Sequence, residues 1–436
     1  IAPLDDLHSP KGAIKKAQHL AAEAFGADET FFSVQGTSGA IMTMILTICG
    51  PGDKILVPRN VHKSIMSAIV FAGAIPVFIH PEVDKELGVS HGISVESVEK
   101  AIEAHPDAKG LLVINPTYFG LAADLKRIVD ISHAHGIPVV VDEAHGVHIH
   151  FHNDLPISAM SAGADMAATS VHKLGGSMTQ SSVLNVREGL VSAKRVQSIL
   201  SMLTTTSTSY PLLASLDTAR RQLAIHGEDL IGEAIEIAEE TRKRINEIEH
   251  IHCVGREILQ SSATYDMDPT KLLISVKNLG ITGFEAEIWL REKANIEVEL
   301  SDLYNILCLI TLGDTKKEVD MLVNALSRMV VAYESAATIV ESAVTLPDIP
   351  GLAMSPRDAF YAETESIPLL EASGRISAEF VMVYPPGIPI FIPGEIITQG
   401  NIDYILMNLE AGLPVQGPED DTLEMIHVIK EHQAII

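Results

Sequence analysis

The sequence has few cysteines and no apolar run long enough to span a bilayer. Three cysteines occur among its 436 residues, far apart and in apolar surroundings, which argues against a disulfide framework and suits a reducing compartment. The first residues do not resemble a secretion signal. We therefore expect a cytoplasmic protein with no membrane partner. Because Ile1 opens what reads as the middle of a domain, we also expect native sequence to precede it.

Basic residues are also scarce. Lysine and arginine total 31 against 57 acidic residues, a formal net charge of −26, and no basic block is present that could follow a phosphate backbone. Nucleic acid is therefore not expected as a partner. An acidic surface instead favours the approach of small cationic molecules. With 47% hydrophobic residues, a chain of this length should fold into two or three domains.

Apolar runs alternate with helical patterns at least five times in the first half of the chain. Such runs indicate a parallel α/β sheet covered on both faces, with ligands at the carboxyl ends of its strands. At those ends lie residues 115–120, Asp142 to His145, and Ser170 to Lys173. The predicted strands are 30–34, 54–57, 75–79, 110–114 and 137–141, and helices are expected at 95–104 and 125–135.

The second half reads differently. From Gly227 the composition changes to a charged helix, followed by strands and helices typical of a smaller α/β domain. A polar connection then leads to a C-terminal part in which residues 383–395 form a rigid loop rich in proline and glycine. We predict a large domain at 1–226, a small domain at 227–345 and a C-terminal domain at 346–436.

Asp142 and Lys173 are the central pair. A lysine at the end of a buried strand can lose its proton by desolvation and form a Schiff base. An aspartate at the end of another apolar strand can keep a pyridine nitrogen protonated, which makes pyridoxal phosphate an electron sink. The alternative is a plain ion pair.

Hydroxyl residues suggest a phosphate site. In residues 35–39 glycines flank Thr37 and Ser38 at the start of a helix, where free N–H groups and the helix dipole favour an anion. The alternative is that one hydroxyl merely caps the helix. The run at 204–209, before Pro211, is either a loop with a cap or a second source of phosphate ligands.

Histidines raise two further hypotheses. His62 lies in a strand-to-helix loop and could stack on a flat heteroaromatic ring, or be an ordinary hydrogen-bonded loop histidine. His148, His150 and His152 would line one face of an extended segment, which suggests a metal. No carboxylate or thiolate completes that ligand set, so we expect no metal site.

Five motifs occur in an order that matches a known family. The sequence resembles the bacterial ornithine/lysine/arginine decarboxylases of the aspartate-aminotransferase fold (fold type I of the pyridoxal-phosphate enzymes), most closely the short biosynthetic arginine decarboxylases of bacilli, over essentially its whole length. A Pro-Gly-His-Lys signature and a receiver-like wing domain known in the family are absent. The motifs are Gly36-Thr37-Ser38, His62-Lys63-Ser64, Asp142-Glu143-Ala144-His145-Gly146, Ser170-Val171-His172-Lys173 and Tyr384-Pro385-Pro386-Gly387.

The resemblance implies a large pyridoxal-phosphate domain, a small α/β domain and a C-terminal α+β domain. It also implies that Lys173 carries the cofactor and that Asp142 pairs with its ring nitrogen. A homodimer is the minimum assembly, because a hydroxyl of the run 204–206, assigned to Thr205, reaches the phosphate of a second subunit. The remaining cofactor contacts implied are Thr37, Ser38 and Ser170 at the phosphate, His62 over the ring, and Ala144 and His145 beside it.

The activity implied is decarboxylation of a basic amino acid, foremost L-arginine to agmatine and carbon dioxide in polyamine and spermidine biosynthesis. Lysine or ornithine is the alternative substrate, and an aminotransferase, an aldolase or a metal-dependent protein is a rival. Lys173 or His172 would return a proton after carbon dioxide leaves. An acidic residue should pair with the distal cation, with Glu395 as first candidate and Asp6 as second.

Overall fold

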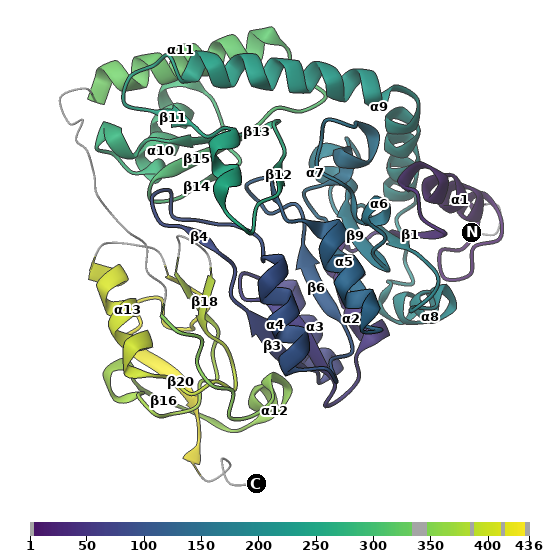
Figure 1. Ribbon diagram of the computed structural model, residues 1–436, viewed down its shortest axis with the longest axis vertical. Coiled ribbons are helices and arrows are strands. Elements are labelled where there is room, and N and C mark those ends of the chain that lie inside the picture. Colours follow the sequence, from purple (N-terminus) through teal and green to yellow (C-terminus); the bar gives the residue numbers. More distant parts are fainter. Residues whose placement is uncertain (1–3, 334–346, 384–387, 411–414, 432–436) are drawn as a thin grey trace.

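The computed structural model describes residues 4–333, 347–383, 388–410 and 415–431 (Figure 1). A seven-stranded sheet, in the order β1-β10-β9-β8-β6-β2-β3, forms its centre. Five neighbouring strands from β9 to β3 run parallel, whereas β10 runs antiparallel to both of its neighbours, β9 and β1. The strands are β1 (Glu29–Ser33), β2 (Lys54–Pro58), β3 (Ile75–Ile79), β6 (Leu111–Ile114), β8 (Val139–Asp142), β9 (Met166–Ser170) and β10 (Ser182–Val186).

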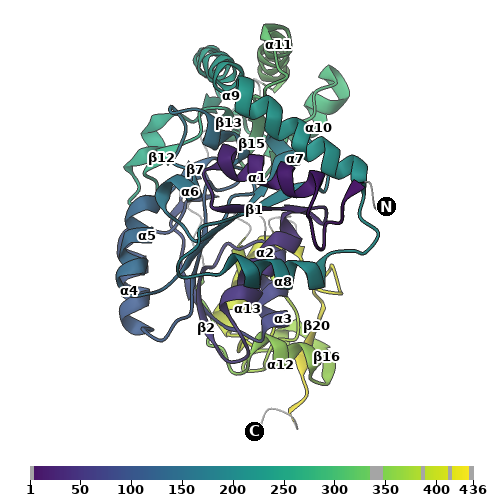
Figure 2. The ribbon, with the colours of Figure 1, turned by 90° about the vertical axis from the view of Figure 1, so that its right-hand side faces the viewer.

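Helices cover both faces of this sheet, as Figure 2 shows. Alternate strand residues point to opposite faces, so Val140 enters one core while Val139 and Val141 enter the other. The continuous apolar runs are therefore explained by burial on two sides. The first core is closed by α2 (Gly36–Ile48), α3 (Lys63–Ala72) and α8 (Ala193–Leu203), and the second by α4 (Val95–Ala104), α5 (Leu125–Ala134) and α6 (Ala159–Ala162).

A second layer of structure follows a 36-residue helix, α9 (Tyr210–Ile245). Its first half packs with α1 (Ala13–Phe25) into the large domain, and its second half into the core of a four-stranded antiparallel sheet. The boundary predicted at 226/227 therefore falls inside one continuous helix. The small sheet contains β11 (His252–Cys253), β13 (Lys271–Ser275), β15 (Asn305–Leu309) and β14 (Leu300–Ser301), covered by α10 (Gly283–Ala294) and α11 (Lys316–Tyr333).

Two short strand pairs lie outside these sheets, and one of them connects the two parts. β7 (Leu121–Ala122) pairs with β12 (Asp266–Met267), which ties the large domain to the small one, and β4 (Val83–Asp84) pairs with β5 (Val89–Ser90). None of the helices in the described ranges is both long and apolar enough to cross a membrane.

The C-terminal part packs against α3 of the large domain through α12 (Pro356–Tyr361). The boundary predicted at 345/346 and the motif Tyr384 to Gly387 lie outside the described residues. The remaining elements are β16 (Thr364–Pro368) paired with β20 (Met425–Ile429), β17 (Val381–Val383) between β18 (Ile388–Phe391) and β19 (Val415–Gln416), and α13 (Gln399–Glu410).

Candidate functional site

The site lies where β8 and β9 end. Asp142 is the last residue of β8 and Ser170 the last residue of β9, and these neighbouring strands run parallel. A short helix, α7 (Val171–Leu174), begins directly after β9 and carries Lys173. Parallel strands bring their carboxyl ends to the same sheet edge, so Asp142 and Lys173, which are 31 positions apart in sequence, reach one region.

Asp142 and Lys173 influence each other's ionisation. Burial raises the pKa of Asp142 to about 6, while the N–H of Ala144, at 3.2 Å, and the charge of Lys173 oppose the rise. Burial lowers the pKa of Lys173, and the negative charge of Asp142 opposes that shift. The site therefore holds a carboxylate whose charged form is destabilised by burial and would be stabilised by a cationic partner, and an amine that gives up its proton more easily than a free lysine.

His145 lies against Lys173. Its Nε2 is 2.6 Å from Lys173 Nζ, and its Nδ1 is 3.5 Å from the Nζ of a second lysine, Lys271. The ring of Tyr118 lies 4.3 Å from that of His145, centroid to centroid, and 5.8 Å from Lys173 Nζ. The sequence placed Tyr118 at a strand end without giving it a role. It gave no signal for Lys271, which belongs to an apolar strand of the other sheet.

Hydroxyls from three elements meet at the start of α2. Thr37 Oγ1 hydrogen-bonds to Ser170 Oγ at the end of β9 and lies 3.1 Å from Ser182 Oγ at the start of β10. Ser182 was missed, because a serine at a strand start is unremarkable in sequence. The residue that caps α2 is Gln35, with no side-chain bond, so the alternative that Thr37 or Ser38 caps the helix is wrong.

His62 is a hydrogen-bonded loop histidine in this structure, and its stacking on a ring stays a prediction. It caps α3, and its Nδ1 accepts from the N–H of Ser64 at 3.2 Å and lies 2.8 Å from Ser64 Oγ. Burial, and then the charge of Lys173, lowers its pKa, so the ring is neutral and sits on the Lys173 side. These bonds lie in the ring plane and leave the ring faces for stacking.

Glu395 does not belong to this site. Its two oxygens lie 2.6 and 2.8 Å from the guanidinium nitrogens of Arg59, and one of them also accepts from the N–H of Ile392 at 3.0 Å. Both charged side chains are 1% exposed. A carboxylate so fully engaged cannot also bind a substrate cation, so the prediction that Glu395 binds the substrate is corrected.

Three other predicted residues make local contacts in this subunit. Asp6 is exposed and accepts from the N–H of His8 at 3.0 Å. Thr205 is exposed and its hydroxyl accepts from the N–H of Ser207 at 3.3 Å. His172 Nδ1 donates to the carbonyl of Ser181 at 2.9 Å, which leaves Nε2 as the nitrogen able to carry a mobile proton. Their functional roles stay predictions.

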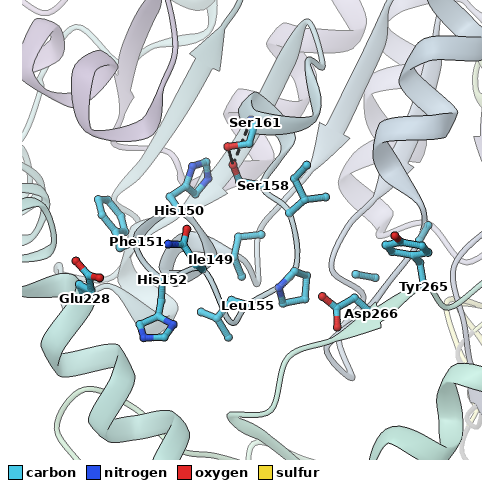
Figure 3. Close-up of a pocket in the computed structure, with 15 residues that line it drawn as sticks. Ile149, His150, Phe151, His152, Leu155, Ser158, Ser161, Glu228, Tyr265 and Asp266 are labelled. Atoms are coloured by element: carbon cyan, nitrogen blue, oxygen red, sulfur yellow. Dashed lines mark hydrogen bonds between the residues drawn. The ribbon is translucent and has the colours of Figure 1, made fainter.

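The histidine-rich segment forms a 3₁₀ helix, η2 (Val147–Phe151), rather than an extended strand. His148 pairs with Asp268 at 2.7 Å and His150 with Glu143 at 2.6 Å. His150 and His152 line a cavity of about 520 Å³ that shares no residue with the Lys173 site (Figure 3). Within the part of the chain that the structure describes, no three histidines, cysteines or carboxylates are grouped to hold a metal.

Family models match almost the entire chain: the Orn/Lys/Arg decarboxylase major domain covers residues 1–318 and the corresponding C-terminal domain covers residues 339–422. The chain belongs to the Orn/Lys/Arg decarboxylase family. An arginine decarboxylase of Bacillus subtilis is 71% identical over 436 residues, which is 100% of this chain and 89% of that protein. A second, from Halalkalibacterium halodurans, is 70% identical over 438 residues, with 100% and 89% covered.

Solved structures agree on the fold. The lysine decarboxylase LdcF of Francisella novicida has a TM-score of 0.85 at 23% identity, covering 98% of this chain and 73% of that one. A serine palmitoyltransferase of Sphingomonas wittichii has a TM-score of 0.58 at 16% identity, covering 74% and 77%. The family and the α/β fold of the type I pyridoxal-phosphate enzymes, both expected from the sequence, are thereby confirmed.

Pyridoxal phosphate is the cofactor that this family implies, as the sequence predicted, and the residues of the site fit it. The converging hydroxyls at the start of α2 suit a phosphate, since helix N-termini offer free N–H groups to anions. The buried Asp142 suits a protonated ring nitrogen, and the amine of Lys173 suits an aldehyde. The chain is therefore a pyridoxal-phosphate-dependent decarboxylase.

Proposed function

We propose that this protein converts L-arginine to agmatine and carbon dioxide, a first step toward polyamines such as spermidine. The observation that carries the substrate is the 71% identity to an arginine decarboxylase along the entire chain. The constitutive lysine decarboxylase of Escherichia coli is only 25% identical over 532 aligned positions, so lysine is the second candidate and ornithine the third. Buried free cysteines support a cytoplasmic setting.

Each side chain of the site would have a separate role in binding the cofactor. When bound, the cofactor withdraws electrons from the substrate α-carbon, which lets the carboxylate leave as carbon dioxide. Asp142 would hold its ring nitrogen charged and Lys173 its aldehyde. His62 would lie over the ring, with Ala144 and His145 beside it, and the hydroxyls of Thr37, Ser38, Ser170 and Ser182 would bind its phosphate.

Proton return is assigned to Lys173, with His172 as the alternative. The lowered pKa of Lys173 makes its ammonium form a better proton donor than an ordinary lysine, which suits the return of a proton to the substrate carbon. His145 Nε2, 2.6 Å away, holds Nζ in place. His172 instead points one nitrogen at the carbonyl of Ser181.

Glu299 takes the place of Glu395 as the acidic residue for the distal cation. Its carboxylate accepts from the hydroxyl of Tyr118 at 2.8 Å, and its charge raises the pKa of Lys173. It is exposed, so it can exchange water for a guanidinium. Asp6, also exposed, is the second candidate.

We further propose a homodimer with shared sites. Lys173 and His62 are exposed in one subunit, which suits a site completed by a second, and Thr205 is exposed on the surface as a reaching residue must be. Mixing Lys173→Ala with Thr205→Val subunits should then restore activity that neither variant has alone. If mixed dimers form but stay inactive, the shared-site arrangement is wrong.

The function is tested by supplying the protein, loaded with pyridoxal phosphate, with arginine, lysine and ornithine separately. We expect carbon dioxide and agmatine from arginine, with kcat/KM at least about tenfold above the other two. No release from any substrate would contradict the decarboxylase, and amino transfer to an added 2-oxo acid would favour the aminotransferase. A visible absorption band that disappears in Lys173→Ala separates these from a metal-dependent protein.

A further inference from the structure

Lys271 is a buried lysine in the core between the domains. It is the first residue of β13 and 1% exposed. Its chain passes so close to Gly120 that a Cβ on that glycine, whose φ is +84°, would lie 2.7 Å from Lys271 Cδ. Burying an ammonium group costs free energy unless the group is paired, so a buried lysine at this position needs a functional or structural explanation.

The contacts of Lys271 lead to the reactive amine. Its Nζ is 3.5 Å from Nδ1 of His145, and Nε2 of the same ring is 2.6 Å from Lys173 Nζ. Burial, followed by the charges of Lys271 and Lys173, holds the pKa of His145 well below its usual range, so the ring is neutral; His148 and His62 act in the same direction. A neutral imidazole donates through one nitrogen and accepts through the other.

The two tautomers of the neutral ring each satisfy both contacts, and each requires the lysine that faces the ring N–H to be neutral. In the first, a charged Lys271 donates to Nδ1, and Nε2–H donates to the lone pair of a neutral Lys173. In the second, Nδ1–H donates to a neutral Lys271, and a charged Lys173 donates to Nε2. The tautomer of His145 therefore decides which of the two lysines must be unprotonated and which is free to keep its proton.

Neighbouring charges favour the first arrangement. Asp268 is fully buried and accepts from His148 Nε2 at 2.7 Å and from Thr270 at 2.9 Å through its backbone N–H. Burial raises the pKa of Asp268, but the charges of His148 and Lys271 and the hydrogen bonds from His148 and Thr270 outweigh burial and hold that pKa well below its usual range, so Asp268 is ionised. Burial lowers the pKa of Lys271 to about 8, with Asp268 and Glu299 opposing the fall and Lys173 adding to it. At pH 7 Lys271 is therefore mostly charged.

We propose that Lys271 is a positioning residue: its ammonium donates to Nδ1 of His145, which turns Nε2–H toward Lys173 and leaves the Lys173 amine unprotonated. The inference rests on the proposed function, in which that amine reacts with the cofactor aldehyde. It adds a residue of the small domain to the control of a nucleophile in the large domain.

The first test measures Lys173 without the cofactor. Competitive acetylation of the cofactor-free protein across pH, read by peptide mass spectrometry, gives the apparent pKa of Lys173. We expect Lys271→Met to raise the pKa of Lys173 by about one unit. The labelling rate of Lys173 near pH 7.5 should therefore fall by about tenfold. Lys271→Arg should restore part of the rate. Lys277→Met is the matched control, since Lys277 contacts the carbonyl of Glu86 and the ring of Tyr304.

A double variant separates action through the ring from action through space. In a His145→Ala background, Lys271→Met should change the labelling rate of Lys173 much less than in the native background. An equal change in both backgrounds, or no change in either, overturns the proposal. Failure of the substrate panel would leave these cofactor-free measurements untouched, so the two proposals fail separately.

A measurement on the unmutated protein guards against variants that do not fold. Nitrogen NMR of cofactor-free protein labelled in its histidine rings, with His145→Gln used only for assignment, reports the tautomer directly. We expect a protonated Nε2 and an unprotonated Nδ1 at pH 7. A protonated Nδ1 would contradict the proposal.

Discussion

At the scale of single residues, the site depends on ionisable groups whose charged forms are destabilised by their surroundings. Burial raises the pKa of Asp142 and lowers the pKa of Lys173. Their residue types and strand-end positions were visible in the sequence, because apolar runs locate strands and the chain order of the motifs matched a family. Tyr118, Ser182 and Lys271 were not visible, since their importance comes from neighbours far away in the chain.

The first prediction concerns Asp142→Asn in the cofactor-free protein. The folded-state pKa of Asp142, about 6, exceeds the ordinary 3.8, so the folded protein binds more protons between these values and its stability falls as pH rises through them. Removing the ionisable group should raise the free energy of unfolding at pH 8 by about 1–3 kcal/mol and change it little at pH 4. Denaturant titrations at both pH values measure this.

The same substitution should abolish decarboxylation. Asp302→Asn is the matched control, because burial also raises the pKa of Asp302 to about 6 although its partner is Asn305 in the small domain. It should leave cofactor affinity unchanged. A stable, active Asp142→Asn enzyme would remove the assigned role.

The second prediction concerns Glu299→Gln. Losing a charge-assisted hydrogen bond of about 1.5–3 kcal/mol should raise KM for arginine about ten- to hundredfold while kcat changes less. Glu297→Gln, which alters a neighbouring exposed carboxylate bound to Arg291 at 2.9 Å, is the control. Steady-state kinetics measure both variants. Equal KM values would contradict the role of Glu299 and favour Asp6 as the residue that binds the distal cation.

At the scale of elements, periodicity and composition predicted most of the strands and helices of the large domain. Helices expected at 95–104 and 125–135 occur as α4 and α5, because their apolar faces must cover a sheet that is buried on both sides. Composition did not show that one helix, α9, continues through Gly227, where the surface charge changes without interrupting it. It also could not show that His148 and His150 pair with carboxylates instead of a metal.

The third prediction tests the start of α2. Thr37→Val removes the hydroxyl that meets Ser170 and Ser182, and a lost bond to an anion should weaken cofactor binding by about tenfold or more. Thr43→Val is matched, since Thr43 is buried on the same helix and donates to the carbonyl of Gly39 at 2.8 Å. Cofactor titrations followed by visible absorption compare them. Equal affinities would place the phosphate elsewhere.

At the scale of the whole molecule, distant pairings decide what a side chain can do. Glu395 looked suited to a substrate cation because it is an acid in a rigid loop. Its partner Arg59 lies 336 positions away, in the loop after β2, and no local pattern announces such a pair. The three-domain division itself stays a prediction.

The fourth prediction follows from that ion pair. Glu395→Gln leaves a buried guanidinium without its counter-charge and should lower the free energy of unfolding by about 3–5 kcal/mol. Glu365→Gln, which breaks the more exposed pair with Arg375 at 2.6 Å, should cost less than about 1 kcal/mol. Denaturation curves measure both. A raised KM for arginine with native stability would instead restore Glu395 to the substrate site.

The long helix α9 has a consequence for how the protein comes apart. Leu213, Leu216 and Leu223 are anchored in one core, and Ala234, Ala238 and Ile245 in another, on a single uninterrupted rod. If either core unfolds, half of α9 loses its packing, and this destabilises the helical structure of the other half. The two bodies should therefore melt together in one cooperative step, and a fragment cut at residue 226 should be insoluble rather than a folded unit.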